Sequence, residues 1–125
     1  MQIRDAHFPG RAPLDAYGDG GFRFAGMSHR GSLLCVPSGI YGWTPVSFED
    51  LTLEAFDRVL QETGDIEVLL VGTGTDLKPL PEGLKQAFRE AGIISDSMST
   101  GAAIRTFNVM LSEERAVAAA LLAVD

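Results

Sequence analysis

The fold class of this chain is decided by the stretch Ile66-Glu67-Val68-Leu69-Leu70-Val71-Gly72-Thr73-Gly74-Thr75. Apart from Glu67, its first six residues are aliphatic, and a short unbroken run of this kind is typical of a strand buried on both faces. The two glycines then end the strand. A strand that is buried on both faces lies in a sheet with a layer of structure on each side. In α/β proteins these layers are helices, so this stretch favours an α/β architecture.

Helical patterns flank this strand. Before it, apolar residues recur at helical spacing over 53–60. After it, a helix is predicted over 81–92, because proline suits the first helical position and glycine suits the C-terminal end. A third helix is predicted over 100–111, with Thr100 as its N-cap, after a short strand at 93–94.

The N-terminal part is predicted to be β structure. Residues 1–16 contain prolines, a glycine and several charges, and are expected to form an irregular arm. Residues 22–25 and 32–36 both favour strands, and the polar turn at 26–31 predicts that they pair as a hairpin. Types that favour β structure continue over 40–43.

The run 116–124 allows two interpretations. It is wholly apolar and rich in alanine, which favours a helix by propensity. Its lack of periodicity equally fits a central strand that is buried on both sides. With either outcome, the alternation of strands and helices predicts one α/β domain of 125 residues, in which helices cover a mixed sheet and the N-terminal hairpin adds antiparallel strands.

The composition disfavours several classes of protein. Acidic residues outnumber basic ones by 17 to 10, and the net charge of -7 disfavours nucleic acid and anionic membranes as partners. The run 116–124 is too short to cross a bilayer as a helix, and residues 1–10 lack the apolar segment of a secretory signal. The single cysteine, Cys35, allows no internal disulfide. We therefore expect a cytoplasmic protein that is not integral to a membrane.

The turn Gly72-Thr73-Gly74 is a candidate ligand-binding site. Its main-chain amides lie outside the end of a predicted strand, where they are able to converge on an anion. The lysine of a P-loop and the third glycine of a dinucleotide fingerprint are both missing. A plain strand-end turn is therefore the competing interpretation.

A second polar group follows in the chain, and it contains Asp96, Thr100, Arg105 and Asn108. In a helix that begins at Thr100, Arg105 and Asn108 share one face. Arg105 would bind an anionic group through two hydrogen bonds, Asn108 would add another, and Asp96 is the candidate base. In the structural interpretation, which we favour, Thr100 caps the helix, Asn108 satisfies backbone groups and Asp96 pairs with Arg105.

Tyr41 and Trp43 are candidates for contacts with a protein partner, because aromatic side chains anchor many interfaces. They equally suit a lid over a small core. Cys35 lies between two apolar neighbours and is expected to be a buried, inert thiol. The spacing of serine, histidine, cysteine and acidic residues forms no catalytic triad, nucleophile elbow or zinc site, so we predict no catalytic residue, metal or cofactor.

Several segments occur in a characteristic order: Phe8-Pro9-Gly10, Gly42-Trp43, Val71-Gly72-Thr73-Gly74, Gly92-Ile93, Asp96-Ser97-Met98-Ser99-Thr100, Ala103-Ile104-Arg105-Thr106-Phe107-Asn108 and Arg115-Ala116-Val117-Ala118-Ala119-Ala120-Leu121. Together they resemble the Mth-domain family, a domain of unknown function numbered 498. The resemblance spans nearly the whole chain. It implies a compact three-layer α/β fold around a mixed sheet, in which 100–111 is a helix and 115–122 is a strand, and we therefore predict a buried strand over 116–122.

The resemblance also implies a function. Eukaryotic relatives in this family include an assembly factor for mitochondrial respiratory complex I and an adipogenesis-associated protein, and no catalytic residues carry over. We therefore expect a non-enzymatic binding or assembly module with a protein partner. The alternative is a protein or enzyme that binds a small anionic ligand in a cleft near Gly74. An exposed Arg105 in a hollow beside Gly74 would favour the ligand, whereas a covered Arg105 with an apolar patch around Trp43 would favour the partner.

Overall fold

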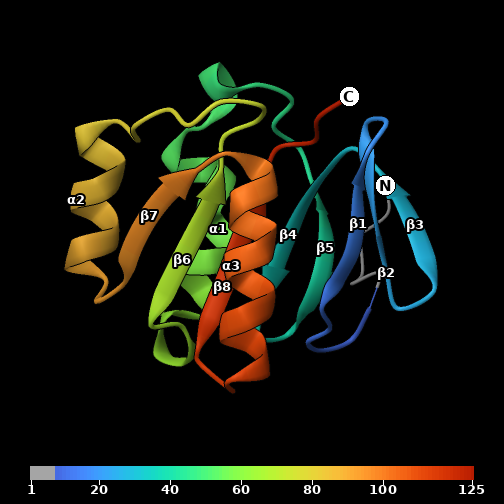
Figure 1. Cartoon of the computed structure of the whole chain (residues 1–125). Helices are drawn as coiled ribbons and strands as arrows, with labels where there is room; N and C mark the ends of the chain where they lie inside the picture. Colours follow the sequence, from blue (N-terminus) through green and yellow to red (C-terminus); the bar gives the residue numbers. More distant parts are fainter. Residues whose placement is uncertain (1–7) are drawn as a thin grey trace, which may run out of the picture.

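Residues 8–125, the part of the chain that this computed structural model describes, form two sheets with helices packed on them (Figure 1). The larger sheet contains β4 (Ser32–Val36), β5 (Gly39–Trp43), β6 (Val68–Gly72), β7 (Ile94–Met98) and β8 (Val117–Leu121). Their order across the sheet is β5-β4-β8-β6-β7. Since β6 runs parallel to β7 and β8 while β4 runs antiparallel to β5 and β8, the sheet is mixed, as predicted.

The strand β8 confirms that the alanine-rich run is not a continuation of the preceding helix. That helix, α3 (Thr100–Ser112), ends before Glu114, whose φ of 60° helps to reverse the chain. β8 is buried along its whole length and pairs with β4 on one side and β6 on the other. Small alanine side chains fit between the layers, so the tertiary pairing of a central strand overrides the helical propensity of alanine.

The smaller sheet contains β1 (Leu14–Gly18), β2 (Gly21–Phe24) and β3 (Met27–Arg30), which are antiparallel and lie in that order. The expected hairpin between 22–25 and 32–36 is therefore wrong. β2 pairs with β3, which forms inside the predicted turn, because Ala25 and Gly26 both have positive φ, at 51° and 75°. A two-residue turn of this kind has the twist that joins neighbouring antiparallel strands.

The irregular N-terminal arm is shorter than predicted. Its last residues, from Leu14 onward, belong to β1, and Leu14 is buried in the core. Residues 1–7 of the expected arm lie outside the described residues. Phe8 makes an isolated antiparallel bridge to Ile40 of β5, and this bridge joins the start of the described chain to the larger sheet.

The helices agree with the prediction in position and differ in detail. α2 (Glu82–Glu90) lies within the predicted range 81–92, but Pro81 is its N-cap rather than its first helical residue. The predicted helix over 53–60 is divided into a 3-10 turn, η2 (Leu53–Phe56), and a short helix, α1 (Asp57–Gln61), with further 3-10 turns η1 (Phe48–Asp50) and η3 (Thr63–Asp65) nearby. The cap of α3 is Ser99 rather than Thr100, because the Ser99 hydroxyl accepts a hydrogen bond from the Ala102 amide at 3.3 Å.

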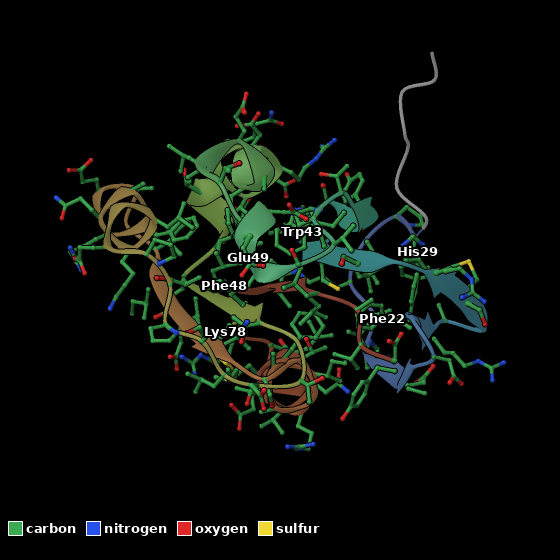
Figure 2. The ribbon with its side chains drawn as sticks, turned by 90° about the horizontal axis from the view of Figure 1, so that it is seen from above. Phe22, His29, Trp43, Phe48, Glu49 and Lys78 are labelled. Carbon is green, nitrogen blue, oxygen red and sulfur yellow. The ribbon has the colours of Figure 1, made fainter. Side chains whose placement is uncertain are left out.

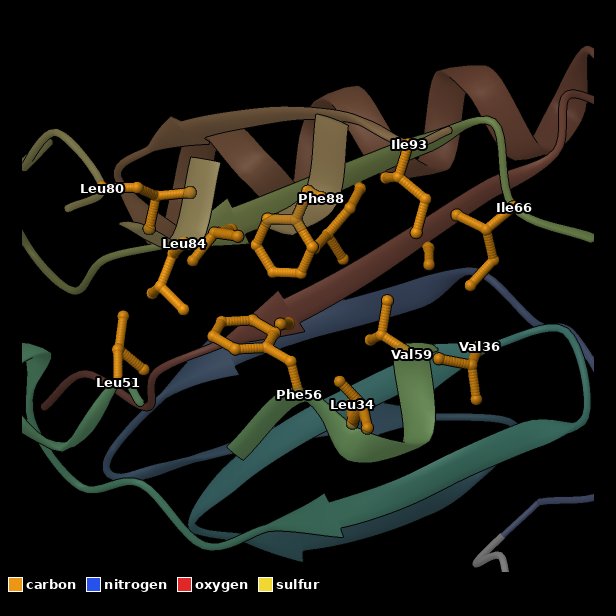
Figure 3. Packing of buried hydrophobic residues seen from close by; sticks show 14 of the residues in the cluster. Leu34, Val36, Leu51, Phe56, Val59, Ile66, Leu80, Leu84, Phe88 and Ile93 are labelled. Carbon is orange, nitrogen blue, oxygen red and sulfur yellow. The ribbon is translucent and has the colours of Figure 1, made fainter. Parts of the chain in front are cut away.

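Apolar cores on both faces of the larger sheet produce the three layers. One core packs α1 and α2 against the sheet, with Phe56 in edge-to-face contact with Phe88 at 5.0 Å between ring centroids (Figure 3). The other core packs α3 and the smaller sheet against the opposite face, and includes Phe22, Phe24 and Phe107. Alternate residues of β4, β6 and β8 enter the two cores, which is why these strands have no polar face.

Candidate functional site

β6, β7 and β8 are parallel, so their carboxyl ends lie side by side at one end of the larger sheet. We call this end the carboxyl edge of the sheet. The turn after β6, the N-terminus of α3 and the residues after β8 lie together there, at the top of Figure 1. This edge is where open α/β sheets most often bind ligands. It also contains Gly72, Thr73, Gly74 and Thr100 of the predicted site.

Thr100 links the segments at this carboxyl edge through the hydrogen bonds of its side chain. Its side chain is fully buried, and its hydroxyl donates to the Leu122 carbonyl at 2.7 Å and accepts from the Gly74 amide at 3.0 Å. The Thr100 amide also donates to the Gly74 carbonyl at 2.8 Å. A Cβ at Gly72 would lie 2.9 Å from the Thr100 Cα, so glycine allows this close approach. Thr100 therefore joins three segments of the fold and presents no free polar group to a ligand.

Thr73 has a similar internal role. It is buried, and its hydroxyl lies 2.7 Å from the Asp76 carbonyl and 3.1 Å from the Met98 carbonyl. The same oxygen accepts from the Lys78 amide at 3.0 Å. These bonds fix the loop after β6, so this part of the predicted site is occupied by internal contacts.

Arg105 lies exposed on α3 and lines a hollow of about 270 Å³ at the same edge. The hollow is also lined by Tyr17, Gly74, Thr75, Ser99, Gly101, Val124 and Asp125. The structure thus brings Arg105 and Gly74 of the predicted site together. Asp125 lines the same hollow, so its negative charge offsets part of the positive charge of the guanidinium there.

The predicted ion pair between Asp96 and Arg105 is wrong. In the described residues, ion pairs join Arg89 to Glu82 and Arg115 to Glu67, and neither involves Asp96 or Arg105. Asp96 is exposed in the middle of the edge strand β7. Arg105 instead shares its hollow with Tyr17 of β1, whereas the next residue of α3, Thr106, contacts Met98 of β7.

Asn108 has the structural role predicted for it. Its side-chain oxygen accepts from the Leu14 amide at 2.9 Å, and its nitrogen donates to the Leu14 carbonyl at 2.8 Å. This pair of bonds ties β1 to α3. Asn108 lines a different hollow from Arg105, beside Arg11, Pro13 and Leu111, so the two residues do not form one site.

Trp43 is not an exposed anchor. It is only 9% exposed, its indole N–H donates to the Ala55 carbonyl at 2.7 Å, and its ring meets Phe56 edge to face at 5.3 Å. Figure 2 shows Trp43 directed into the molecule. Of the two roles considered for Trp43, a contact with a protein partner and a lid over the core, its burial agrees with the lid. Tyr41 is half-buried, and the Arg58 guanidinium lies 4.3 Å from its ring centroid.

Cys35 is buried in the core, as predicted. Loss of water around it raises the pKa of the thiol far above its ordinary range, so it stays protonated. Among residues 8–125, no three histidine, cysteine or acidic residues gather in an arrangement that would hold a metal ion.

The structure has a basic surface on the smaller sheet that the sequence analysis did not predict. Arg23 and Arg30, with Ser28 and Ala16, line a hollow of about 510 Å³. Recognition of 27–30 as a strand would have revealed it, since pairing between 22–24 and 27–30 places both arginines on the face opposite the two phenylalanines.

A mixed sheet covered by helices on one face, and by a helix and a second sheet on the other, defines this protein as a three-layer α/β protein. The chain belongs to the family described as "Protein of unknown function (DUF498/DUF598)", whose model matches residues 14–122. This confirms the family resemblance. A Mth938-like domain from Bordetella pertussis has the same fold, with a TM-score of 0.80 and 23% identity over 98% of this chain and 92% of that one.

Relatives are found in bacteria and animals. An uncharacterised protein of Rhodobacter capsulatus is 43% identical over 98% of this chain and 93% of its own length. "NADH dehydrogenase [ubiquinone] 1 alpha subcomplex assembly factor 3" of Mus musculus is 30% identical over 98% of this chain, which spans only 66% of the mouse protein.

A solved structure from Bartonella henselae, described as an outer membrane protein, has a TM-score of 0.92 and 62% identity, over 95% of this chain and 100% of that one. In the described part of this chain, no helix has the length and apolar character needed to span a membrane.

Proposed function

We propose that this protein is a non-enzymatic assembly module that binds a protein partner during the construction of a respiratory NADH dehydrogenase. The observation that carries the proposal is the similarity, over 98% of the chain, to the mouse assembly factor. The matched region includes the complete three-layer fold. The buried, internally bonded side chains of Thr73, Thr100 and Asn108 support a structural rather than catalytic use of this polar group.

The test uses the relative in Rhodobacter capsulatus, which is similar along nearly its full length. Its gene is deleted, and the strain then receives either this chain or an empty vector. We expect membranes of the deletion strain to lose NADH oxidation and the assembled NADH dehydrogenase on native gels, and this chain to restore both. Succinate oxidation is the control and should stay unchanged. Normal NADH dehydrogenase in the deletion strain, or no recovery with this chain, would contradict the proposal.

A second candidate function is the binding of a small anion by Arg105. It is supported by the exposed guanidinium, which has no ion pair in the described residues and shares a hollow with Gly74. The exposed Arg105 beside Gly74 and the buried Trp43 are the outcome that the sequence analysis assigned to a ligand. We nevertheless rank this candidate second, because the charge of Asp125 lies in the same hollow and the similarity to the assembly factor covers 98% of the chain. Phosphate should raise the melting temperature of the wild type and of a control variant, Arg89→Gln, but not that of Arg105→Gln. Equal shifts in all three proteins, or none, would exclude this anion site.

We also propose a cytoplasmic location, which is supported by the single buried cysteine and the acidic composition. Fractionation of the native cell into cytoplasm, periplasm and membranes, followed by immunoblotting, tests it. Recovery in the outer membrane fraction would contradict it.

A further inference from the structure

The outer face of the smaller sheet carries a pair of arginines above a floor of small residues. We call the surface formed by Ala16, Gly21, Arg23, Ser28 and Arg30 the arginine face. Arg23 lies opposite Ser28, and Gly21 lies opposite Arg30, so these four residues share one face of β2 and β3. Phe22 and Phe24 alternate with them and point into the core.

The arginine face is hollow. The floor residues Ala16, Gly21 and Ser28 are short, and the two long arginine side chains border the space above them. The hollow has a volume of about 510 Å³, which lies in the range of sites that bind small ligands. No described side chain fills this hollow, whereas Leu14, Phe22 and Phe24 on the opposite face of the sheet enter the core.

The two arginines of the arginine face make no ion pair in the described residues. Arg23 and Arg30 are both exposed. They occupy diagonal positions on neighbouring strands, where side chains of this length come within reach of each other. Asp19 lines the same hollow, and Asp125 lines a neighbouring hollow together with Arg30, but neither carboxylate forms an ion pair with an arginine of this face. Two like charges above an open hollow favour an anionic partner, which would relieve their repulsion.

The free edge of β3 indicates the shape of that partner. Within the described residues, β3 pairs with β2 alone, and it forms the outer edge of the smaller sheet. An edge strand presents unpaired backbone groups to a further extended chain. Side chains of an added strand alternate between faces, so every second one would lie over the arginine face.

We propose that the arginine face and the edge of β3 bind an extended acidic segment of a protein partner, which pairs with β3 and places alternate carboxylates beside Arg30 and Arg23. This inference rests on the proposed assembly function, whose partner it describes by its chemistry. A short acidic segment meets only this local positive charge, whereas a nucleic acid would extend over the rest of a chain whose net charge is -7.

The direct test is a titration of the ¹⁵N-labelled protein, followed by amide chemical shifts. The probe is a short peptide that alternates glutamate with threonine, and the matched peptide carries lysine in place of glutamate. We expect saturable shifts in β2 and β3 with the glutamate peptide and none with the lysine peptide. The affinity should fall about fivefold to tenfold in the double variant Arg23→Gln/Arg30→Gln. The control variant Lys85→Gln/Arg89→Gln removes the same charge from α2 and should bind like the wild type.

Other results of this titration would overturn the inference. Shifts confined to other elements, equal binding of the lysine peptide, or unchanged affinity in the arginine variant would each do so. Inorganic phosphate and a short single-stranded DNA serve as further probes at the same concentration. If either shifts the β2 and β3 amides as strongly as the glutamate peptide, the face is a general anion site and the proposed protein segment is wrong. Ser28→Tyr, which fills the hollow and keeps both arginines, should also weaken peptide binding.

Complementation in Rhodobacter capsulatus separates this inference from the proposed function. If the wild type restores NADH dehydrogenase and the folded Arg23→Gln/Arg30→Gln variant does not, both are supported. If wild type and variant restore it equally, the assembly function stands and the arginine face is wrong. If the wild type itself fails, the proposed function is wrong whatever the peptide titration shows.

Discussion

Replacement of Thr100 by valine tests whether the carboxyl edge of the parallel strands is held by one buried hydroxyl. Valine has nearly the same shape as threonine, and its methyl group would fill the place of the hydroxyl. The variant therefore removes two hydrogen bonds without opening a cavity: the one donated to the Leu122 carbonyl and the one accepted from the Gly74 amide.

The magnitude follows from the burial of these groups. Thr100 is 0% exposed, so water does not replace the lost hydroxyl. A buried donor or acceptor that loses its partner costs about 1–3 kcal/mol. The Leu122 carbonyl is buried, whereas the Gly74 amide is only part-buried and belongs to a residue that lines the open hollow beside Arg105. We therefore expect Thr100→Val to lower the free energy of unfolding by about 2–3 kcal/mol, a sizeable share of the roughly 5–15 kcal/mol that stabilises a typical domain. Thr100→Ser keeps the hydroxyl and loses one buried methyl group, which costs about 1 kcal/mol.

Urea unfolding measures this difference. The fluorescence of Trp43, the single tryptophan, reports the loss of the core, and circular dichroism reports the loss of secondary structure. The two probes should give coincident transitions with an unchanged dependence on urea concentration, so that the midpoint alone moves. If Thr100→Val is as stable as Thr100→Ser, the hydroxyl does not hold this edge and the reasoning is refuted.

Three further predictions concern single residues. Gly72→Ala should destabilise the protein by about 1–3 kcal/mol in the same urea assay, because its Cβ would lie 2.9 Å from the Thr100 Cα and from a Leu121 methyl group. The control Gly83→Ala, in α2 with nothing within 4 Å, should be neutral or slightly stabilising. Cys35 should react with iodoacetamide only after unfolding, as judged by mass spectrometry, because burial raises the pKa of its thiol; rapid labelling of the native protein would contradict this. Asp50 accepts hydrogen bonds from the Val46 and Ser47 amides, which lower its pKa, so its support of this loop is present above the ordinary pKa of aspartate, about 3.9, and is lost as the pH falls through the lower folded value. The Val46 and Ser47 amide shifts should therefore move only in that acidic range, and Asp50→Asn should abolish the change.

Much of the fold was predictable because its signals are local. The aliphatic run before Gly72 is a buried strand, Pro81 precedes a helix, and polar residues after Leu111 end α3. Each of these elements depends on the conformational preferences of neighbouring residues, which the sequence contains directly. That Asn108 bonds backbone groups was also predicted, but that these groups belong to Leu14, 94 residues away in the chain, was not.

Other features depend on residues that are distant in the chain. The sequence by itself determined an α/β protein with a mixed sheet, and the family resemblance chose a strand for 117–121 over a helix. Only the tertiary structure decided that β2 pairs with β3 rather than with β4, that Trp43 lies inside, and that Arg105 shares a hollow with Tyr17 and forms no ion pair with Asp96. Strand partners and burial depend on which surfaces meet when the layers close, and helix and strand periodicity do not specify that choice.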